Sequence, residues 1–252
     1  MMAERFIDIS LIFYSMRFKE VYDIAVPQKK REMEKWNIFA ANISRPISVL
    51  MTIPLVNTRI KPTTVTLWSV IAAIIGAILL SFGDSMGYWI AGLCFLYLWN
   101  LLDGVDGNLA RCQNTCSKRG ELWDAFGGYA ALVLTFISVS IAAYNDPETF
   151  FLFDRKWLLI LGGLTSSLSI FPRLMLHKKM NMGLGEEDSK KFRDKKNFDL
   201  KQIISLNIIS ATGFMQVFIL IGILTHTLSL LISFYFVVYL IIAIASLIQI
   251  LK

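Results

Sequence analysis

Charged residues, cysteine and histidine are all scarce in this sequence of 252 residues. Charged side chains make up 17% of it and hydrophobic ones 55%, and its mean hydropathy is +0.57. A chain this poor in charge is too apolar for a water-soluble domain. Several apolar runs reach roughly 18–25 residues, the length that crosses about 30 Å of hydrocarbon. These runs are continuously apolar rather than alternating, so we expect an all-α integral membrane protein and not a β-barrel.

The three cysteines and two histidines argue against a zinc site. Cys112 and Cys116 are close in the chain, but tetrahedral zinc needs two further ligands, and His177 and His226 are distant in sequence. We therefore expect the cysteines to be small packing residues in a reducing compartment. The formal net charge of +6 is typical of basic loops on one side of a membrane. No basic patch is interleaved with aromatic residues, so no nucleic-acid partner is expected.

The long apolar runs predict six transmembrane helices preceded by an amphipathic interfacial helix. A single membrane domain is expected at 34–252, after an N-terminal extension at 1–33. The extension is too mixed for a span and lacks the basic start and clean apolar core of a cleavable signal peptide. Within 34–51, apolar residues recur at helical spacing opposite polar ones, and Pro46 either kinks this helix or begins a second piece. The expected spans are about 64–82, 88–102, 122–144, 157–176, 203–224 and 227–251.

Lysine and arginine residues predict the orientation of these spans. Six spans place both termini on one side, together with the stretch 103–121 and the loop 177–201, which are rich in basic residues. The loops expected on the other side contain only Arg155 and Lys156 as basic residues. By the positive-inside rule, we expect a multi-pass protein whose termini and 103–121 stretch face the cytoplasm.

The stretch from Asp103 to Asp124 is the most informative part of the sequence. Acidic residues next to membrane spans are costly, which marks them as candidates for function. Asp103 and Asp106 lie three residues apart on one helix face, where two carboxylates repel unless they share a cation or a proton. Asp124 on the next span can supply a third carboxylate for a magnesium ion, and Arg111 can bind a phosphate. An isolated pair of aspartates would instead favour a helix cap, but the longer pattern favours a cation and diphosphate site.

This stretch resembles the signature of the CDP-alcohol phosphotransferase family, D-x2-D-G-x2-A-R-x8-G-x3-D-x3-D. The residues in register are Asp103, Asp106, Gly107, Ala110, Arg111, Gly120 and Asp124. Pro62 and Thr66 also resemble the Pro-Asn-x-x-Thr start of the family's first span, with Thr63 in place of asparagine. The resemblance covers about residues 34–250 and implies the family's six-span fold.

The resemblance implies a reaction. Such enzymes transfer a phosphoryl-alcohol group from a CDP-alcohol, usually CDP-diacylglycerol, to an acceptor hydroxyl and release CMP, in phospholipid or related synthesis. The implied metal is Mg²⁺ or Mn²⁺, held by Asp103, Asp106 and Asp124, with Arg111 stabilising the phosphates. The residues implied at the substrate are Gly107, Ala110, Arg111, Ser117, Gly120 and Thr66. An acceptor alcohol, membrane lipid and a homodimer complete the expected partners.

One position departs from the family signature. The fourth aspartate, which in the family ligates metal and acts as base on the acceptor, is replaced by Gly128. Glu121 is a weak substitute, because it lies about one turn away on the other side of Asp124. The base is therefore unassigned, and three explanations stay open: an enzyme with another base, an inactive relative that binds CDP-lipid, or an introduced change. Loss of one positioned base typically lowers a rate about 10²–10⁴-fold.

Other polar residues in the spans allow fewer conclusions. Arg173, at the end of the fourth span, is either part of an anionic acceptor site or a side chain that reaches the interface. Gly162 and Gly163 predict close helix packing, and Asn207 and Gln216 are expected to form hydrogen bonds between helices. A transporter is disfavoured, because the sequence shows neither inverted repeats nor interrupted spans in both halves.

Overall fold

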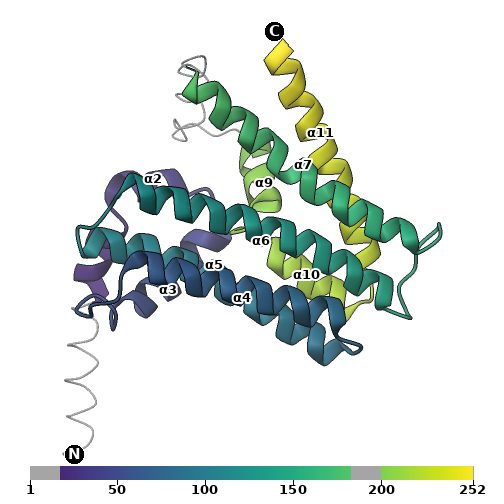
Figure 1. The fold of residues 1–252 in the computed structure, drawn as a ribbon, viewed down its shortest axis with the longest axis horizontal. Coiled ribbons are helices and arrows are strands. Elements are labelled where there is room, and N and C mark those ends of the chain that lie inside the picture. Colours follow the sequence, from purple (N-terminus) through teal and green to yellow (C-terminus); the bar gives the residue numbers. More distant parts are fainter. Residues whose placement is uncertain (1–17, 183–199, 252) are drawn as a thin grey trace, which may run out of the picture.

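The computed structural model describes residues 18–182 and 200–251, and these are helices joined by short turns, with no strand among them (Figure 1). Residues 18–25 are helical and precede the labelled elements. The first elements are α2 (Gln28–Glu34), the π-helical turn η1 (Ala40–Ser44) and α3 (Arg45–Thr52). The longer helices follow: α4 (Pro62–Phe82), α5 (Met86–Cys112), α6 (Lys118–Asn145), α7 (Lys156–Asn181), α9 (Leu200–Ile209), α10 (Met215–Leu224) and α11 (Leu228–Leu251).

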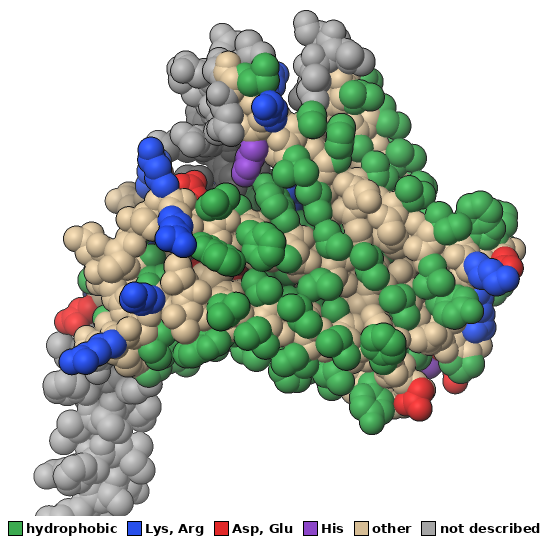
Figure 2. All heavy atoms as spheres, viewed as in Figure 1, with side chains coloured by type: hydrophobic (Ala, Val, Ile, Leu, Met, Phe, Trp, Pro, Cys, Tyr) green, Lys and Arg blue, Asp and Glu red, His purple; other side chains and the backbone are tan. Residues whose placement is uncertain are grey.

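Within the described residues, five helices are long and apolar enough to cross a membrane: α4, α5, α6, α7 and α11. Figure 2 shows that hydrophobic side chains cover the middle of one face, while most lysine, arginine and acidic side chains gather towards its ends. Such a band is what a bilayer requires of the surface it surrounds. Together these features describe a multi-pass membrane protein, as the composition predicts.

The core lies between α4, α5 and α6, with α7 packed on α6 and α11 on α7 (Figure 1). Glycines allow α4 and α5 to approach closely, since a Cβ atom at Gly76 of α4 would lie 2.7 Å from the Gly92 carbonyl oxygen of α5. Leu96 and Phe136 fill the interior beside Tyr235 of α11. In a bilayer such contacts stabilise the bundle mainly by close van der Waals packing, because lipid is as apolar as these side chains. This packing fixes the C-terminal end of α5 relative to the N-terminal end of α6.

The segment expected as one amphipathic helix at 34–51 has a different form. Helix α2 ends at Glu34, and a turn leads into η1 and then directly into α3. The reason is local, because Pro46 has no N–H and cannot complete the α-helical ladder. The preceding N–H, of Arg45, bonds to the Ala40 carbonyl five residues back. Of the two expectations for Pro46, the structure has the second helical piece.

The expected fifth span at 203–224 is also not one helix. It is divided into α9 and α10 by a turn at 210–214. Gly213 fits there because an added Cβ would overlap the Asn207 carbonyl group. The carbonyls freed at the end of α9 accept hydrogen bonds from two α11 tyrosines: Tyr235 donates to Ile208 at 2.9 Å and Tyr239 to Ile209 at 3.0 Å. Partners of this kind are what allow a helix to break at membrane depth.

Candidate active site

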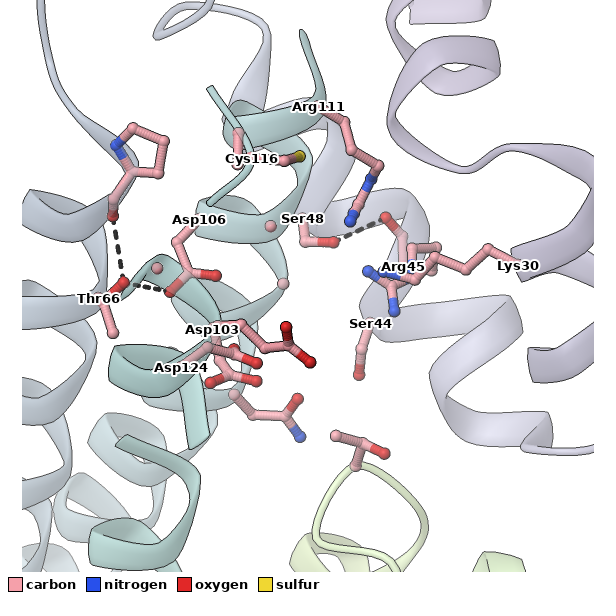
Figure 3. A pocket seen from close by; sticks show the side chains of 18 of the residues that line it. Lys30, Ser44, Arg45, Ser48, Thr66, Asp103, Asp106, Arg111, Cys116 and Asp124 are labelled. Carbon is pink, nitrogen blue, oxygen red and sulfur yellow. Dashed lines mark hydrogen bonds between the residues drawn. The ribbon is translucent and has the colours of Figure 1, made fainter. Parts of the chain in front are cut away.

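Three carboxylates converge where α5 and α6 approach each other. Helix α5 does not stop before the acidic stretch but continues through it to Cys112, presenting Asp103 and Asp106 on one face. Helix α6 begins at Lys118 and brings Asp124 opposite them (Figure 3). One oxygen from each carboxylate lies within 4.8 Å of the others. The structure thus brings together the three residues that the spacing predicts as one cluster.

The chemistry of this cluster fits a hard divalent cation. All three groups offer oxygen ligands, which magnesium and manganese prefer. Asp106 is only 4% exposed, and Asp103 Oδ1 is buried without a hydrogen-bond partner among the described residues. A buried carboxylate oxygen without a partner is costly, and a cation would satisfy it. Asp124 is exposed and leaves the cluster open to the cavity.

Thr66 orients the most buried of these carboxylates. It lies in the first turns of α4, which begins at Pro62, and is 4% exposed. Its hydroxyl donates to Asp106 Oδ2 at 2.6 Å (Figure 3). The family resemblance implies Thr66 as a substrate contact. In the structure it lines the cavity, and its hydroxyl is directed at the carboxylate, where it fixes the orientation of a candidate metal ligand.

Arg111 lies against Gly107, and Gly107 precedes it by one turn of α5. A Cβ atom at Gly107 would lie 3.4 Å from Arg111 Nη1, so the glycine leaves this space to the guanidinium. Arg111 Nη2 donates to Asn108 Oδ1 at 2.9 Å, and Nε donates to the Ala25 carbonyl of the N-terminal segment at 2.5 Å. These bonds use part of the guanidinium, and the side chain lines the same cavity as the acidic cluster.

A cavity of about 980 Å³ joins the acidic cluster to basic residues from the N-terminal part of the chain. Arg45 forms a bidentate pair with Glu34, with Nε to Oε2 at 3.0 Å and Nη2 to Oε1 at 2.6 Å. Lys30 Nζ lies 3.8 Å from the same Glu34 carboxylate. Burial lowers the pKa of Lys30 to about 8, and the charges of Arg45 and Arg111 contribute to this lowering. The cavity therefore has an acidic and a basic side.

Other residues implied at the substrate have structural roles in the described chain. Ser117 caps α6, because its hydroxyl accepts from the backbone N–H of Gly120 at 3.1 Å. Ala110, Ser117 and Gly120 all line the cavity. Ser117 is therefore placed where it can reach a substrate, and its contact with one stays a prediction.

Two positions from the sequence analysis lie outside the residues that line the cavity. Gly128 follows Asp124 by one turn of α6, and a Cβ added there would meet nothing within 4 Å. The position is therefore open to a side chain, and the chain has none there. Arg173 of α7 does not line this cavity, and its role in acceptor binding remains a prediction. The basic residues that do line it before α4 are Lys30 of α2, Arg45 of α3 and Lys61.

The family profile for CDP-alcohol phosphatidyltransferases matches residues 59–250. The chain belongs to this family. A curated relative, cholinephosphotransferase 1 of Rattus norvegicus, is 34% identical over 90 residues. That match covers 33% of this chain and 23% of the relative, so the chain matches less than a quarter of the relative's length.

The segment that matches the CDP-alcohol phosphatidyltransferase profile contains the acidic cluster but not all residues that line the cavity. Lys30, Glu34, Ser44 and Arg45 line the cavity and precede residue 59, where the family match begins. Sequence reasoning leaves the role of Lys30 unassigned, because the extension 1–33 has no motif, and it assigns Glu34 only to the start of the amphipathic segment at 34–51. The run Gln28–Lys29–Lys30–Arg31 is the one available signal, and its composition alone does not show which lysine faces a cavity.

Proposed function

We propose that this chain is a metal-dependent CDP-alcohol phosphotransferase of phospholipid or related synthesis. The observation that supports it most directly is the convergence of Asp103, Asp106 and Asp124 in one cavity with Arg111, in a chain of this family. The cavity combines cation ligands with a phosphate-binding side chain, as transfer from a diphosphate requires.

The proposed reaction exchanges a phosphoanhydride bond for a phosphate ester bond. The acceptor oxygen forms a bond to the phosphorus that carries the alcohol, the bond from that phosphorus to the bridging oxygen breaks, and CMP leaves with that oxygen. The proton of the acceptor hydroxyl goes to the base, which is unassigned in this chain. Asp103, Asp106 and Asp124 would hold Mg²⁺ or Mn²⁺, which polarises the phosphoryl group and neutralises charge on the leaving oxygen. Thr66 would keep Asp106 oriented, and Arg111 would bind the diphosphate.

The donor alcohol belongs to the proposal. CDP-diacylglycerol is the donor implied by the family resemblance. The curated relative has cholinephosphotransferase in its name, so CDP-choline belongs in the same panel of donors. The proposal also places the cavity end of the bundle at the cytoplasmic surface, where the basic loops of the chain lie, and the apolar band in membrane lipid.

Gly128 supports a second candidate function. A family member with no carboxylate at this position would bind the CDP-lipid without normal turnover, because no base takes the proton of the acceptor. The family signature has an aspartate here, and the structure has open space for such a side chain. The cluster of three carboxylates would still bind cation and nucleotide in such a protein.

Release of CMP by the purified protein separates the two candidates. We expect release with Mg²⁺ or Mn²⁺, a CDP-alcohol donor and a panel of acceptor alcohols, and its loss in Asp106→Ala. Gly128→Asp should raise the rate, by up to about 10²–10⁴-fold if a positioned base is what the native chain lacks. CMP release only in Gly128→Asp favours the inactive relative. Release that survives Asp106→Ala contradicts the proposed metal site.

A further inference from the structure

The cavity has a second group of polar residues, which we call the N-terminal wall: Lys30, Ser44 and Arg45. All three line the cavity and come from α2, η1 and α3, across from the acidic cluster (Figure 3). None of them belongs to the segment matched by the family profile. The function proposed above makes no use of this wall.

The wall has more positive charge than its counter-ion neutralises. Glu34 is the carboxylate that pairs with both Lys30 and Arg45 among the described residues. The Lys30–Glu34 distance of 3.8 Å is longer than a hydrogen bond, so this pair leaves the donors of the ammonium group available. The Arg45–Glu34 pair uses Nε and Nη2, while Nη1 lies near Gly104, beside the acidic cluster.

Ser44 gives an independent indication of a ligand. Its side chain is 7% exposed, and its Oγ is buried with no hydrogen-bond partner among the described residues. An unpaired buried hydroxyl costs about 1–3 kcal/mol, and a ligand atom in the cavity would satisfy it. Figure 3 shows Ser44 beside Arg45, across the cavity from the carboxylates.

The N-terminal segment is held in place by contacts of its own. Val21, Ala25 and Val26 are buried against Val49 and Ile53 of the α3 region. The Ala25 carbonyl also accepts a hydrogen bond from Arg111. Lys30 therefore reaches the cavity from a packed segment, and its neighbour Lys29 is exposed on the same helix.

We propose that the N-terminal wall is a phosphate-binding subsite, with Lys30 and Arg45 as cations and Ser44 as a hydroxyl donor. Phosphate combines the negative charge and multiple acceptor oxygens that these three groups match. Two sources offer such a group: the second phosphate of the CDP-alcohol donor, or a phosphate on the acceptor. Their assignment to substrates rests on the function proposed above.

Binding to the full-length protein in detergent, measured by titration calorimetry with Mg²⁺, tests the subsite. The probes are CDP, CMP, and inorganic phosphate added to CMP-loaded protein. The variant is Lys30→Met, which keeps the aliphatic stem, with Lys30→Arg to retain the charge and Lys29→Met as the matched exposed control. Loss of one charged phosphate contact lowers affinity about tenfold or more.

Two results support the subsite and distinguish its sources. Weaker CDP binding in Lys30→Met with unchanged CMP binding assigns the wall to the donor's second phosphate. Unchanged CDP binding with weaker binding of inorganic phosphate assigns it to an acceptor phosphate. In both cases Lys30→Arg should retain most of the affinity, and Lys29→Met should match the native chain.

Other results overturn the subsite. These are unchanged affinity for all probes in Lys30→Met, an equal loss in Lys30→Arg, or an equal loss in Lys29→Met. If Lys30→Met does not fold, Ser44→Ala decides in its place, since it removes a hydroxyl with no partner among the described residues; unchanged affinity then contradicts the proposal. If phosphate binding depends on Lys30 but no CMP is released, the proposed function is refuted and the subsite is kept. If CMP is released but no binding depends on Lys30, the subsite is refuted and the proposed function is kept.

Discussion

The hydrogen bond from Thr66 to Asp106 links the first long helix to the acidic cluster, and it gives a prediction at the scale of one residue. Thr66→Val removes the hydroxyl but keeps the shape, so the buried carboxylate loses its orienting donor. We expect affinity for Mn²⁺ to fall about 10–100-fold, as for other partners of metal ligands. Electron paramagnetic resonance of free Mn²⁺ measures it. Thr66→Ser should bind as the native chain does, and equal binding by Thr66→Val would contradict the role.

Single residues also show how far a sequence can be read. The cluster of Asp103, Asp106 and Asp124 could be predicted, because helical spacing and two adjacent spans bring them together. The partner of Asp106 could not, since Thr66 lies 40 positions away and contacts it only after α4 packs on α5. Lys30 could not be predicted for the same reason, because its place depends on the packing of Val21 and its neighbours.

At the scale of helices, the contact between α6 and α7 depends on one glycine. A Cβ atom at Gly162 would overlap the Ser140 side chain and lie 3.1 Å from the Phe136 carbonyl oxygen, whereas one at Gly163 would meet nothing within 4 Å. We expect Gly162→Ala to destabilise the protein by about 1–3 kcal/mol, as other overpacked sites do. Thermal unfolding in detergent measures this, with Gly163→Ala as the matched control. Equal melting temperatures for the two variants would show that the helices are not in tight contact there.

The break between α9 and α10 shows what helical periodicity does not reveal. The 203–224 run is apolar enough for a span, but its Asn207 side chain bonds outward, donating to the Trp36 carbonyl and accepting from the Ile38 N–H at 2.8 Å. Gln216 of α10 donates to the Leu96 carbonyl of α5 at 3.1 Å, which is the interhelical bond that the sequence predicts, whereas Asn207 bonds to the segment between α2 and η1. Their partners lie more than a hundred positions away, so these contacts form only when distant segments pack together.

For the whole molecule, α9 and α10 together complete a path between the two ends of the bundle. Asn207 of α9 contacts the 36–38 turn near the cavity, and at the other end His226 Nδ1 lies 3.0 Å from Asp146 Oδ1. This contact raises the pKa of His226, mainly through its hydrogen bond to Asp146. Helix α10 alone spans only about 15 Å, so the pair is needed for a crossing. We therefore propose six crossings, five by the long helices and one by α9 with α10.

Six crossings and the positive-inside rule predict that the cavity end faces the cytoplasm, and two positions test this. Cys116 is exposed at the cavity mouth, and Leu152 is 80% exposed in the turn between α6 and α7 at the opposite end. In a chain with Cys94 and Cys112 replaced by alanine, a membrane-impermeant maleimide should label Cys116 only after cells are permeabilised. Leu152→Cys, combined with Cys116→Ala, should be labelled in intact cells. The opposite pattern would reverse the orientation. The apolar band between the two ends requires that the membrane separates them. Labelling of both positions in intact cells would contradict this separation.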